Sequence, residues 1–399
     1  MRRILSYLLF MLLILPGTVF SFNVESVSIT GSVSQGYIKT TEYNFLVPDS
    51  KEGSFKFGEG LLNISCRPYD ELRVGMSVAY RRLGDIGNNE PYINWAMADY
   101  SFKEWLSFRA GIMKTALGFY NETRDMDLFR TAVVLPYGVY RENFRDYFDA
   151  VEGAAIYGMI TQKNIGTLKY QIMAGTDNVP ADSGGSKVYS NFLSSYNSQL
   201  TMKWTDVNED NGVLNIGLTW LTPVTGLLFN YNLYDAGKPK VDLAVGSFEG
   251  LLDVSLHRTY ILGVKYLINN LTAEGEYFKV KINQSIGVTY PTGTVTLLDN
   301  FTSSVSGWYV NSTYRIFDWL EVGLYFSTHK LHKSAIAAEK NIDEICLSLR
   351  FDLAENVILK IEGHKYKDTC DEPFTIDNPG NDFSEDDWMM FASKITLSF

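Results

Sequence analysis

The sequence predicts an all-β fold: a transmembrane antiparallel β-barrel of about 16 strands. Three observations predict this fold. They are an N-terminal export leader, segments of about ten residues that alternate apolar and polar side chains, and connections that are short and long in turn. The 399 residues are 46% hydrophobic and 14% aromatic, which excludes wholesale disorder. The mean hydropathy of −0.07 excludes a bundle of many transmembrane helices, because each needs about 20 mostly apolar residues.

The first element is a leader for export. Arg2 and Arg3 precede an apolar run at Ile4–Leu15, and small residues near Ser21 suit signal peptidase. We therefore predict a cleaved signal peptide at residues 1–21 and a mature barrel at residues 22–399. A retained N-terminal anchor helix is the alternative interpretation.

The strands follow from a two-residue period. Side chains of a strand point to opposite faces in turn, so one face can be apolar and the other polar. In one segment the apolar positions 106, 108, 110 and 112 alternate with Ser107, Arg109 and Gly111. The uncharged segment Gly212–Tyr234 also alternates, which indicates a strand rather than a membrane helix.

Extending this period along the chain gives sixteen predicted strands. They lie at residues 27–38, 54–66, 71–80, 92–102, 105–115, 150–161, 167–175, 193–204, 212–222, 258–268, 271–282, 304–316, 319–329, 342–353, 357–367 and 387–399. Their length of about ten residues favours a membrane barrel over a soluble sandwich, whose strands run about 5–6 residues. The strand at 193–204 has the weakest pattern.

The connections between the predicted strands alternate in length. Thr205–Asn211 and Asn269-Asn270 are among the short ones, whereas Ala116–Asp149 and Pro223–His257 are among the long ones. Outer-membrane barrels have short periplasmic turns and long outer loops. A closed barrel of this size leaves an aqueous lumen, because side chains cannot fill it.

The last strand supports export to a membrane. Ile395, Leu397 and the terminal Phe399 share one face of it, and polar residues occupy the other. This ending resembles the C-terminal assembly signal of Gram-negative outer-membrane proteins. The resemblance implies that the chain reaches the outer membrane, contacts its lipid and is assembled there by the barrel-assembly machinery.

A second resemblance covers residues 109–125, which read RAGIMKTALGFYNETRD. This segment resembles the strand-into-loop segment of bacterial porins, including the substrate-selective sixteen-stranded kind. Those proteins often carry proline where this chain has Ala116. The resemblance implies a homotrimeric, channel-forming barrel in the outer membrane of a Gram-negative bacterium.

The resemblance also implies a constriction loop between the fifth and sixth strands, which is the predicted segment 116–149. Rings of arginine select anions at such a constriction. The expected selectivity residues are Arg109, Arg124, Arg130, Arg141 and Arg145. The expected charged residues of the lumen wall are Arg73, Lys265, Glu274, Glu276, Arg350 and Lys360. A weak anion preference is the hypothesis, although wall residues of opposite charge could simply pair.

The expected function is passive diffusion of small hydrophilic solutes through a channel without enzymatic activity. The alternatives are a surface adhesin or receptor, a soluble β-sandwich and an outer-membrane hydrolase that uses Ser348 with His364. His329 and His332 offer only a weak metal site.

The charge and the motifs narrow the partners. A net charge of −11 disfavours nucleic acid, which needs a basic face. The three cysteines (Cys66, Cys346 and Cys370) are too few for a disulfide framework. The sequence contains no phosphate-binding glycine loop, CxxC pair or dinucleotide fingerprint, so we expect neither a cofactor nor a metal.

Overall fold

The structure is a computed structural model that describes residues 27–399 apart from several short gaps. The gaps are residues 85, 88, 178, 181–182, 197–201, 208–211, 246, 291–292, 334–338, 369–377 and 379–383. The predicted signal peptide, residues 1–21, lies outside the described residues.

Eighteen strands are present in the described part of the chain. Their bounds are β1 Val27–Thr40, β2 Ser54–Tyr69, β3 Leu72–Leu83, β4 Pro91–Lys103, β5 Leu106–Lys114, β6 Ala150–Gln162, β7 Gly166–Thr176, β8 Met202–Val207, β9 Val213–Leu221, β10 Leu227–Asp235, β11 Lys240–Val245, β12 Phe248–Ile268, β13 Leu271–Tyr290, β14 Gly293–Phe317, β15 Leu320–Leu331, β16 Lys340–Ala354, β17 Val357–Lys367 and β18 Asp387–Ser398. The helical segments are α2 Gly184–Tyr196 and the 3₁₀ turns η2 Asn121–Thr123, η3 Asp127–Phe129 and η4 Glu142–Tyr147.

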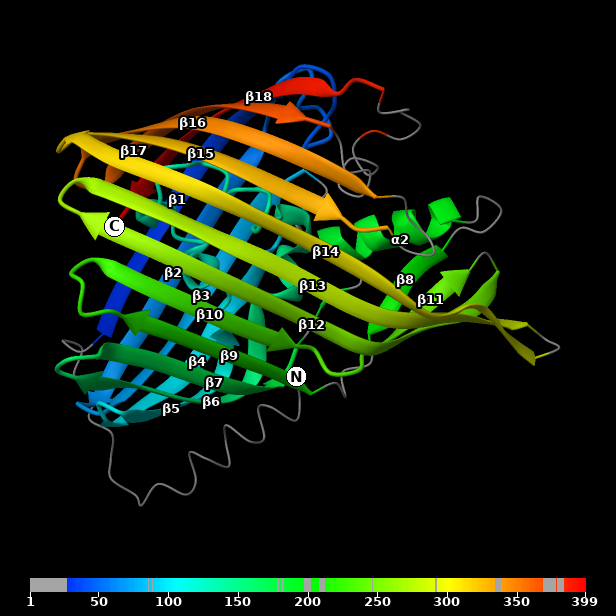
Figure 1. Cartoon of the computed structure of the whole chain (residues 1–399), viewed down its shortest axis with the longest axis horizontal. Helices are drawn as coiled ribbons and strands as arrows, with labels where there is room; N and C mark the ends of the chain where they lie inside the picture. Colours follow the sequence, from blue (N-terminus) through cyan, green and yellow to red (C-terminus); the bar gives the residue numbers. More distant parts are fainter. Residues whose placement is uncertain are drawn as a thin grey trace.

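Sixteen of these strands close into an antiparallel barrel (Figure 1). Each ring strand pairs with its neighbour in sequence, β7 pairs with β9, β10 pairs with β12, and β18 pairs with β1 to close the ring. Only β8 and β11 among the described strands lie outside it. The predicted fold and the strand number are therefore confirmed, and closure leaves no ring strand with an unpaired edge.

The predicted number of strands is correct although two strands were misplaced: one predicted strand is not in the ring, and one ring strand was not predicted. The predicted strand at 193–204 is wrong, because α2 and β8 occupy this region and neither belongs to the ring. Its apolar residues Val188, Phe192 and Tyr196 recur every four residues, which is a helical period. The ring strand that takes its place is β10, which lies inside the predicted long loop 223–257.

The short turn before β10 explains why that strand was missed. Pro223 and Gly226 mark a tight connection between β9 and β10, so a short turn stands where a long loop was predicted. The predicted short connection at 205–211 is correspondingly wrong. It belongs to the long connection between β7 and β9, which carries α2 and β8.

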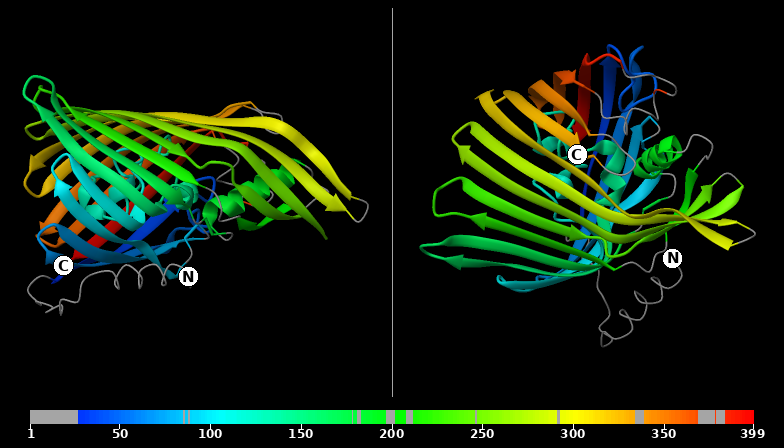
Figure 2. Two further views of the ribbon diagram at one scale, coloured as in Figure 1. Left: turned by 90° about the horizontal axis from the view of Figure 1, so that it is seen from below. Right: turned by 45° about the vertical axis from the view of Figure 1, so that its right-hand side comes forward.

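Strands β12, β13 and β14 extend well beyond the ring (Figure 2). They have 21, 20 and 25 residues and stay paired with one another along their outer halves. The outer half of β12 also pairs with β11, which in turn pairs with β8. A separate apolar cluster that includes Leu243, Val254 and Val288 lies in this extension. The extension projects from the end of the barrel at which the long loops lie.

The barrel is apolar outside and polar inside. Val33, Leu324 and Leu397 point outward and are 61%, 52% and 53% exposed, whereas Lys360 and Lys394 point inward and are buried. An outer face of this kind suits hydrocarbon, because the closed sheet satisfies its own backbone hydrogen bonds. Among the described residues, no helix is both long and apolar enough to cross a bilayer.

Candidate functional site

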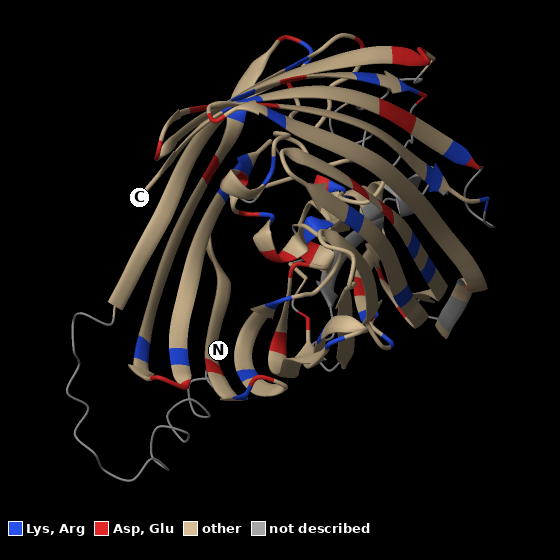
Figure 3. Cartoon of the chain, turned by 60° about the vertical axis from the view of Figure 1, so that its left-hand side comes forward, with Lys and Arg blue, Asp and Glu red and all other residues tan. Residues whose placement is uncertain are grey.

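The connection between β5 and β6 folds into the barrel. We call residues 116–149 the inner loop. Figure 3 shows charged segments inside the ring of strands. The inner loop is one of these segments, because it forms hydrogen bonds with side chains of the ring strands. Its position as the connection after the fifth ring strand matches the prediction.

The first part of the inner loop is held by β9, β10 and β13. The backbone nitrogens of Ala116 and Gly118 donate to the amide oxygens of Asn215 and Asn232, at 2.9 and 2.8 Å. The nitrogen of Phe119 donates to Glu276 Oε1 at 2.8 Å. Buried backbone groups need such partners, because no water replaces them.

The middle of the inner loop crosses β15, β16 and β17. Lys360 Nζ and Arg350 Nη1 donate to the carbonyls of Asp127 and Leu128, each at 2.6 Å. Glu362 accepts from the backbone nitrogens of Val133 and Val134, at 2.7 and 3.0 Å. Wall side chains therefore bind the loop through its main chain.

The same strands hold the loop further along. Tyr137 N donates to Glu344 Oε2 at 3.0 Å, and Gly138 N donates to Ser327 Oγ at 2.7 Å. Gly138 also packs directly on the strand backbone, since a Cβ there would come within 2.6 Å of the Thr328 carbonyl oxygen. The loop thus lies flat on the wall at this point.

Ion pairs hold the two ends of the inner loop together. Asp146 binds Arg81 of β3 at 2.8 Å, and Lys114 of β5 binds Asp125 at 2.8 Å and also Asp149. All of these side chains are at least four-fifths buried. The loop is therefore attached to the wall near its start, its middle and its return.

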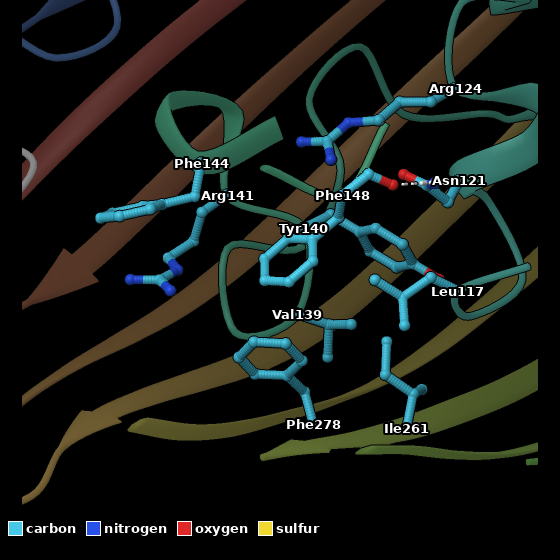
Figure 4. Close-up of a pocket in the computed structure, with 10 residues that line it drawn as sticks. All are labelled: Leu117, Asn121, Arg124, Val139, Tyr140, Arg141, Phe144, Phe148, Ile261 and Phe278. Atoms are coloured by element: carbon cyan, nitrogen blue, oxygen red, sulfur yellow. Dashed lines mark hydrogen bonds between the residues drawn. The ribbon is translucent and has the colours of Figure 1, made fainter. Parts of the chain in front are cut away.

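An apolar contact supplements the polar ones (Figure 4). Val139 and Tyr140 of the loop face Ile261 of β12 and Phe278 of β13. All four side chains are 6% exposed or less. Burial of such side chains contributes about 1.5–3 kcal/mol each relative to exposure.

Asp127 lies in a buried cluster of cations. Its carboxylate is 3.0 Å from Lys360 Nζ, 3.3 Å from Lys394 Nζ and 3.4 Å from Arg130 Nη2, and it accepts from Thr396 Oγ1 at 2.8 Å. Burial alone would raise the pKa of Asp127, but the charges of the two lysines and the arginine outweigh it. The pKa of this carboxyl is held well below its usual range.

Tyrosines of the loop bind wall carboxylates. Tyr120 donates to Glu274 and Tyr140 donates to Glu276. Burial and the neighbouring carboxylates raise the pKa of both phenols well above their ordinary value, so they remain neutral donors.

The five predicted selectivity arginines are all buried or half-buried beside partners. Arg124 binds Glu142 at 2.8 Å, Arg130 lies near Asp127, and Arg145 binds Asp125. Arg141 lies over the Phe144 ring at 4.2 Å. Arg109 lies on β5 and binds Asp99 at 3.0 Å.

The predicted wall residues all belong to ring strands, and most have partners. Lys265 binds Glu274 at 2.8 Å, Arg350 binds Asp352 at 2.8 Å, and Arg73 lies 5.8 Å from the centre of the Trp95 ring. Glu276 and Lys360 hold the inner loop as described. Much of this charge is therefore paired across the wall, which is the alternative that the sequence left open.

A cavity of about 390 Å³ lies between the inner loop and the wall of β12–β16. Its charged lining is Arg130, Lys265, Arg315 and Arg350 together with Glu274 and Glu321. Arg315 is not among the lumen residues expected from the sequence. The sequence feature that could have identified it is the two-residue spacing from Asn311 and Thr313, which places the three side chains on one face of the strand. Asn311 and Thr313 also line the cavity.

The C-terminal strand has the predicted alternation. Ile395, Leu397 and Phe399 are 42%, 53% and 70% exposed on the outer face, while Lys394 and Thr396 are buried inside. Phe399 also exchanges backbone hydrogen bonds of 3.0 Å with Gly31, next to the site of closure.

The residues considered for metal binding and hydrolysis take other roles. Ser348 lies opposite Glu362 and donates to a carbonyl, whereas both nitrogens of His364 face carboxylates, so no Ser–His pair forms. His332 binds Ser306 at 2.8 Å, whereas the ring of His329 is buried against the Tyr137 ring. The two histidines therefore have separate partners and do not face a common metal position.

No family model matches the chain, and no curated protein matches it. Solved structures match over nearly its whole length, covering 94% of the chain in each case below. They include an anion-selective porin from Comamonas acidovorans (12% identity, 99% of that chain, TM-score 0.57), Salmonella typhi OmpF with daunomycin (13%, 97%, 0.54) and the trimer form of OmpT, an outer membrane protein of Vibrio cholerae (9%, 99%, 0.53). At these identities the likeness concerns the fold, and the chain has a porin-type barrel.

Proposed function

We propose that this chain forms a water-filled channel through which small hydrophilic solutes diffuse down their gradients. The observation that carries the proposal is the inner loop, which is bound to the inside of the wall by side chains of strands around the ring. A loop fixed in this way narrows the lumen and sets its size. The charged cavity between loop and wall is the place where a solute meets protein groups.

We further propose that the channel prefers anions. Four cations but only two carboxylates line the cavity. Two more carboxylates, Asp127 and Asp352, bind three of these cations without lining the cavity themselves. A constriction acts on an ion through the charges at its surface, so the exposed excess is positive.

The setting we propose is the outer membrane of a Gram-negative bacterium. The apolar outer face, the exposed Phe399 side chain and the porin-type fold support it. Removal of residues 1–21 as a signal peptide, recognition of the last strand by the assembly machinery and a homotrimeric state belong to the same proposal. The trimer form of Vibrio cholerae OmpT gives a precedent for the last of these.

Conductance across a planar lipid bilayer tests the proposal. Purified mature protein should give discrete single-channel steps, and a salt gradient should give a reversal potential of the sign that anions produce. A clearly cation-selective channel would refute the anion preference alone. A correctly folded barrel without conductance would refute the channel and favour a surface adhesin or receptor.

A further inference from the structure

Three metal-ligand side chains meet on the inner wall, outside the cavity. Cys346 of β16 lies directly opposite His364 of β17, and their Sγ and Nε2 atoms are 3.6 Å apart. Glu362 Oε1 is 2.8 Å from the same Nε2 atom. The ligand atoms of all three residues lie within 4.8 Å of one another, and each residue is at most 1% exposed.

The second nitrogen of His364 is oriented in the way metal-binding histidines require. Its Nδ1 is 2.8 Å from Glu344 Oε1, and the hydroxyls of Tyr325 and Tyr366 also donate to that oxygen at 2.8 Å. A carboxylate behind the ring fixes its rotation and tautomer and makes the free nitrogen a better ligand. Nε2 is left pointing at Cys346 and Glu362.

We propose that Cys346, Glu362 and His364 form a binding site for a divalent transition metal of the zinc type. In a tetrahedral zinc site, thiolate and imidazole ligand atoms lie about 3.6 Å apart. The observed Sγ–Nε2 separation already has this value. The Nε2–Oε1 separation must widen by roughly 0.5 Å to the spacing of zinc-bound N and O atoms. Ion binding therefore displaces the Glu362 carboxylate slightly relative to the Val133 and Val134 nitrogens, from which it accepts hydrogen bonds.

The fourth ligand is water from the adjacent cavity. Tyr325 and Ser348, which flank the three ligands on β15 and β16, line that cavity. Three protein ligands with one open position are typical of zinc sites that are not purely structural. The cavity also gives the ion a path to the site.

The charge balance favours the exchange of protons for the ion. Both nitrogens of His364 lie 2.8 Å from carboxylates, so an imidazolium donating to both satisfies the geometry without metal. The divalent ion replaces the Nε2 proton and the thiol proton of Cys346. Two protons leave as two positive charges enter, so the net charge of the buried site does not change.

Titration of the refolded full-length mature protein in detergent with Co²⁺ tests the site, because a cobalt–thiolate bond gives a charge-transfer absorption band. We expect one Co²⁺ per chain, displacement by Zn²⁺ and release of two protons per ion. The band should persist in the Cys66→Ser, Cys370→Ser double variant, in which Cys346 is the sole thiol. Glu344→Gln should weaken binding about 10–100-fold while keeping the band.

Absence of the band from the wild-type barrel would overturn the proposal, and this result does not depend on the folding of any variant. Loss of the band in the double variant, or its persistence in Cys346→Ser with the barrel folded, would overturn it equally. None of these outcomes depends on conductance, so the site and the channel are tested separately.

Discussion

Replacing Asp127 with asparagine removes the central anion of the inner loop at nearly constant volume. The Asp127 carboxylate is 3% exposed and lies within 3.4 Å of three cations. Removal of one partner from a buried ion pair costs about 3–5 kcal/mol, because the remaining charge stays buried without compensation. Lys394 keeps Glu59, and Lys360 keeps two backbone carbonyls, so we expect the lower end, about 3 kcal/mol.

Two measurements follow from this substitution. The free energy of unfolding should fall by about 3 kcal/mol, a factor of roughly 100 in the equilibrium constant. The reversal potential should move further toward anions, because one negative charge has left the region of the constriction. Single-channel records should show a noisier or larger conductance as the middle of the inner loop detaches.

The pH dependence provides a sharper check. The depressed pKa of Asp127 means that its contribution to stability is present above the unfolded value, about 4, and is lost only as the pH falls through the folded value. The folded value lies well below the usual range, so the destabilisation should be equal at pH 7 and pH 5. The control is Asp49→Asn, which breaks an exposed pair with Lys56 and should cost at most about 1 kcal/mol. If Asp127→Asn behaved like this control in stability and in conductance, the reasoning would be refuted.

Three further predictions test the cavity, the loop and the last strand. Arg350→Gln should move the reversal potential toward cations, whereas Lys56→Gln on the exposed surface should not; an unchanged potential would contradict the assigned role of the cavity. Tyr140→Phe should lower stability at pH 7 by about 0.5–1.5 kcal/mol. Because the folded pKa of Tyr140 is raised, wild-type stability should fall as the pH rises above about 10. Denaturation curves of the variant should show a smaller loss of stability over the same pH range, because the variant has no phenol at this position. Deletion of Phe399 should reduce the fraction of folded barrel in membranes, and Ser398→Ala should not; equal yields would count against an assembly signal.

The period of two predicted the barrel because lipid and water face opposite sides of each strand. It gave correct positions for β1–β7 and for the later ring strands, where every second residue is apolar. It failed on both sides of β9, at residues 184–207 and 227–257. There α2, β8 and β11 leave the ring, so their residues do not follow the lipid–water alternation. The extension of β12–β14 was missed because its outer halves pack on an apolar cluster of their own.

The inner loop was predictable in position but its partners were not. Its order in the chain located it between the fifth and sixth strands, and inward parity identified Lys360 and Glu276. Lys360 donates to the Asp127 carbonyl and Glu276 accepts from the Phe119 nitrogen, and these loop groups lie 233 and 157 residues away in sequence. The grouping of Cys346, Glu362 and His364 was hidden for a similar reason, since it depends on the register between β16 and β17.

The structure assigns two roles to different arginines: one set fixes the shape of the inner loop, and another selects ions by charge. The sequence had suggested the same arginines for both roles. Arg124 and Arg145 are held beside carboxylates and are nearly buried, so their charges mainly fix the shape of the inner loop. A paired, buried charge contributes little field to a passing ion, because its partner cancels it at short range. Selection by charge then depends on the cations that reach the cavity, above all Arg315 and Arg350 near the short-turn end of the barrel. These two are also paired, but their side chains are 31% and 13% exposed, so they lie closer to a passing ion. Neutralising Arg124 or Arg145 should therefore alter conductance and stability more than selectivity, and neutralising Arg315 or Arg350 should do the reverse.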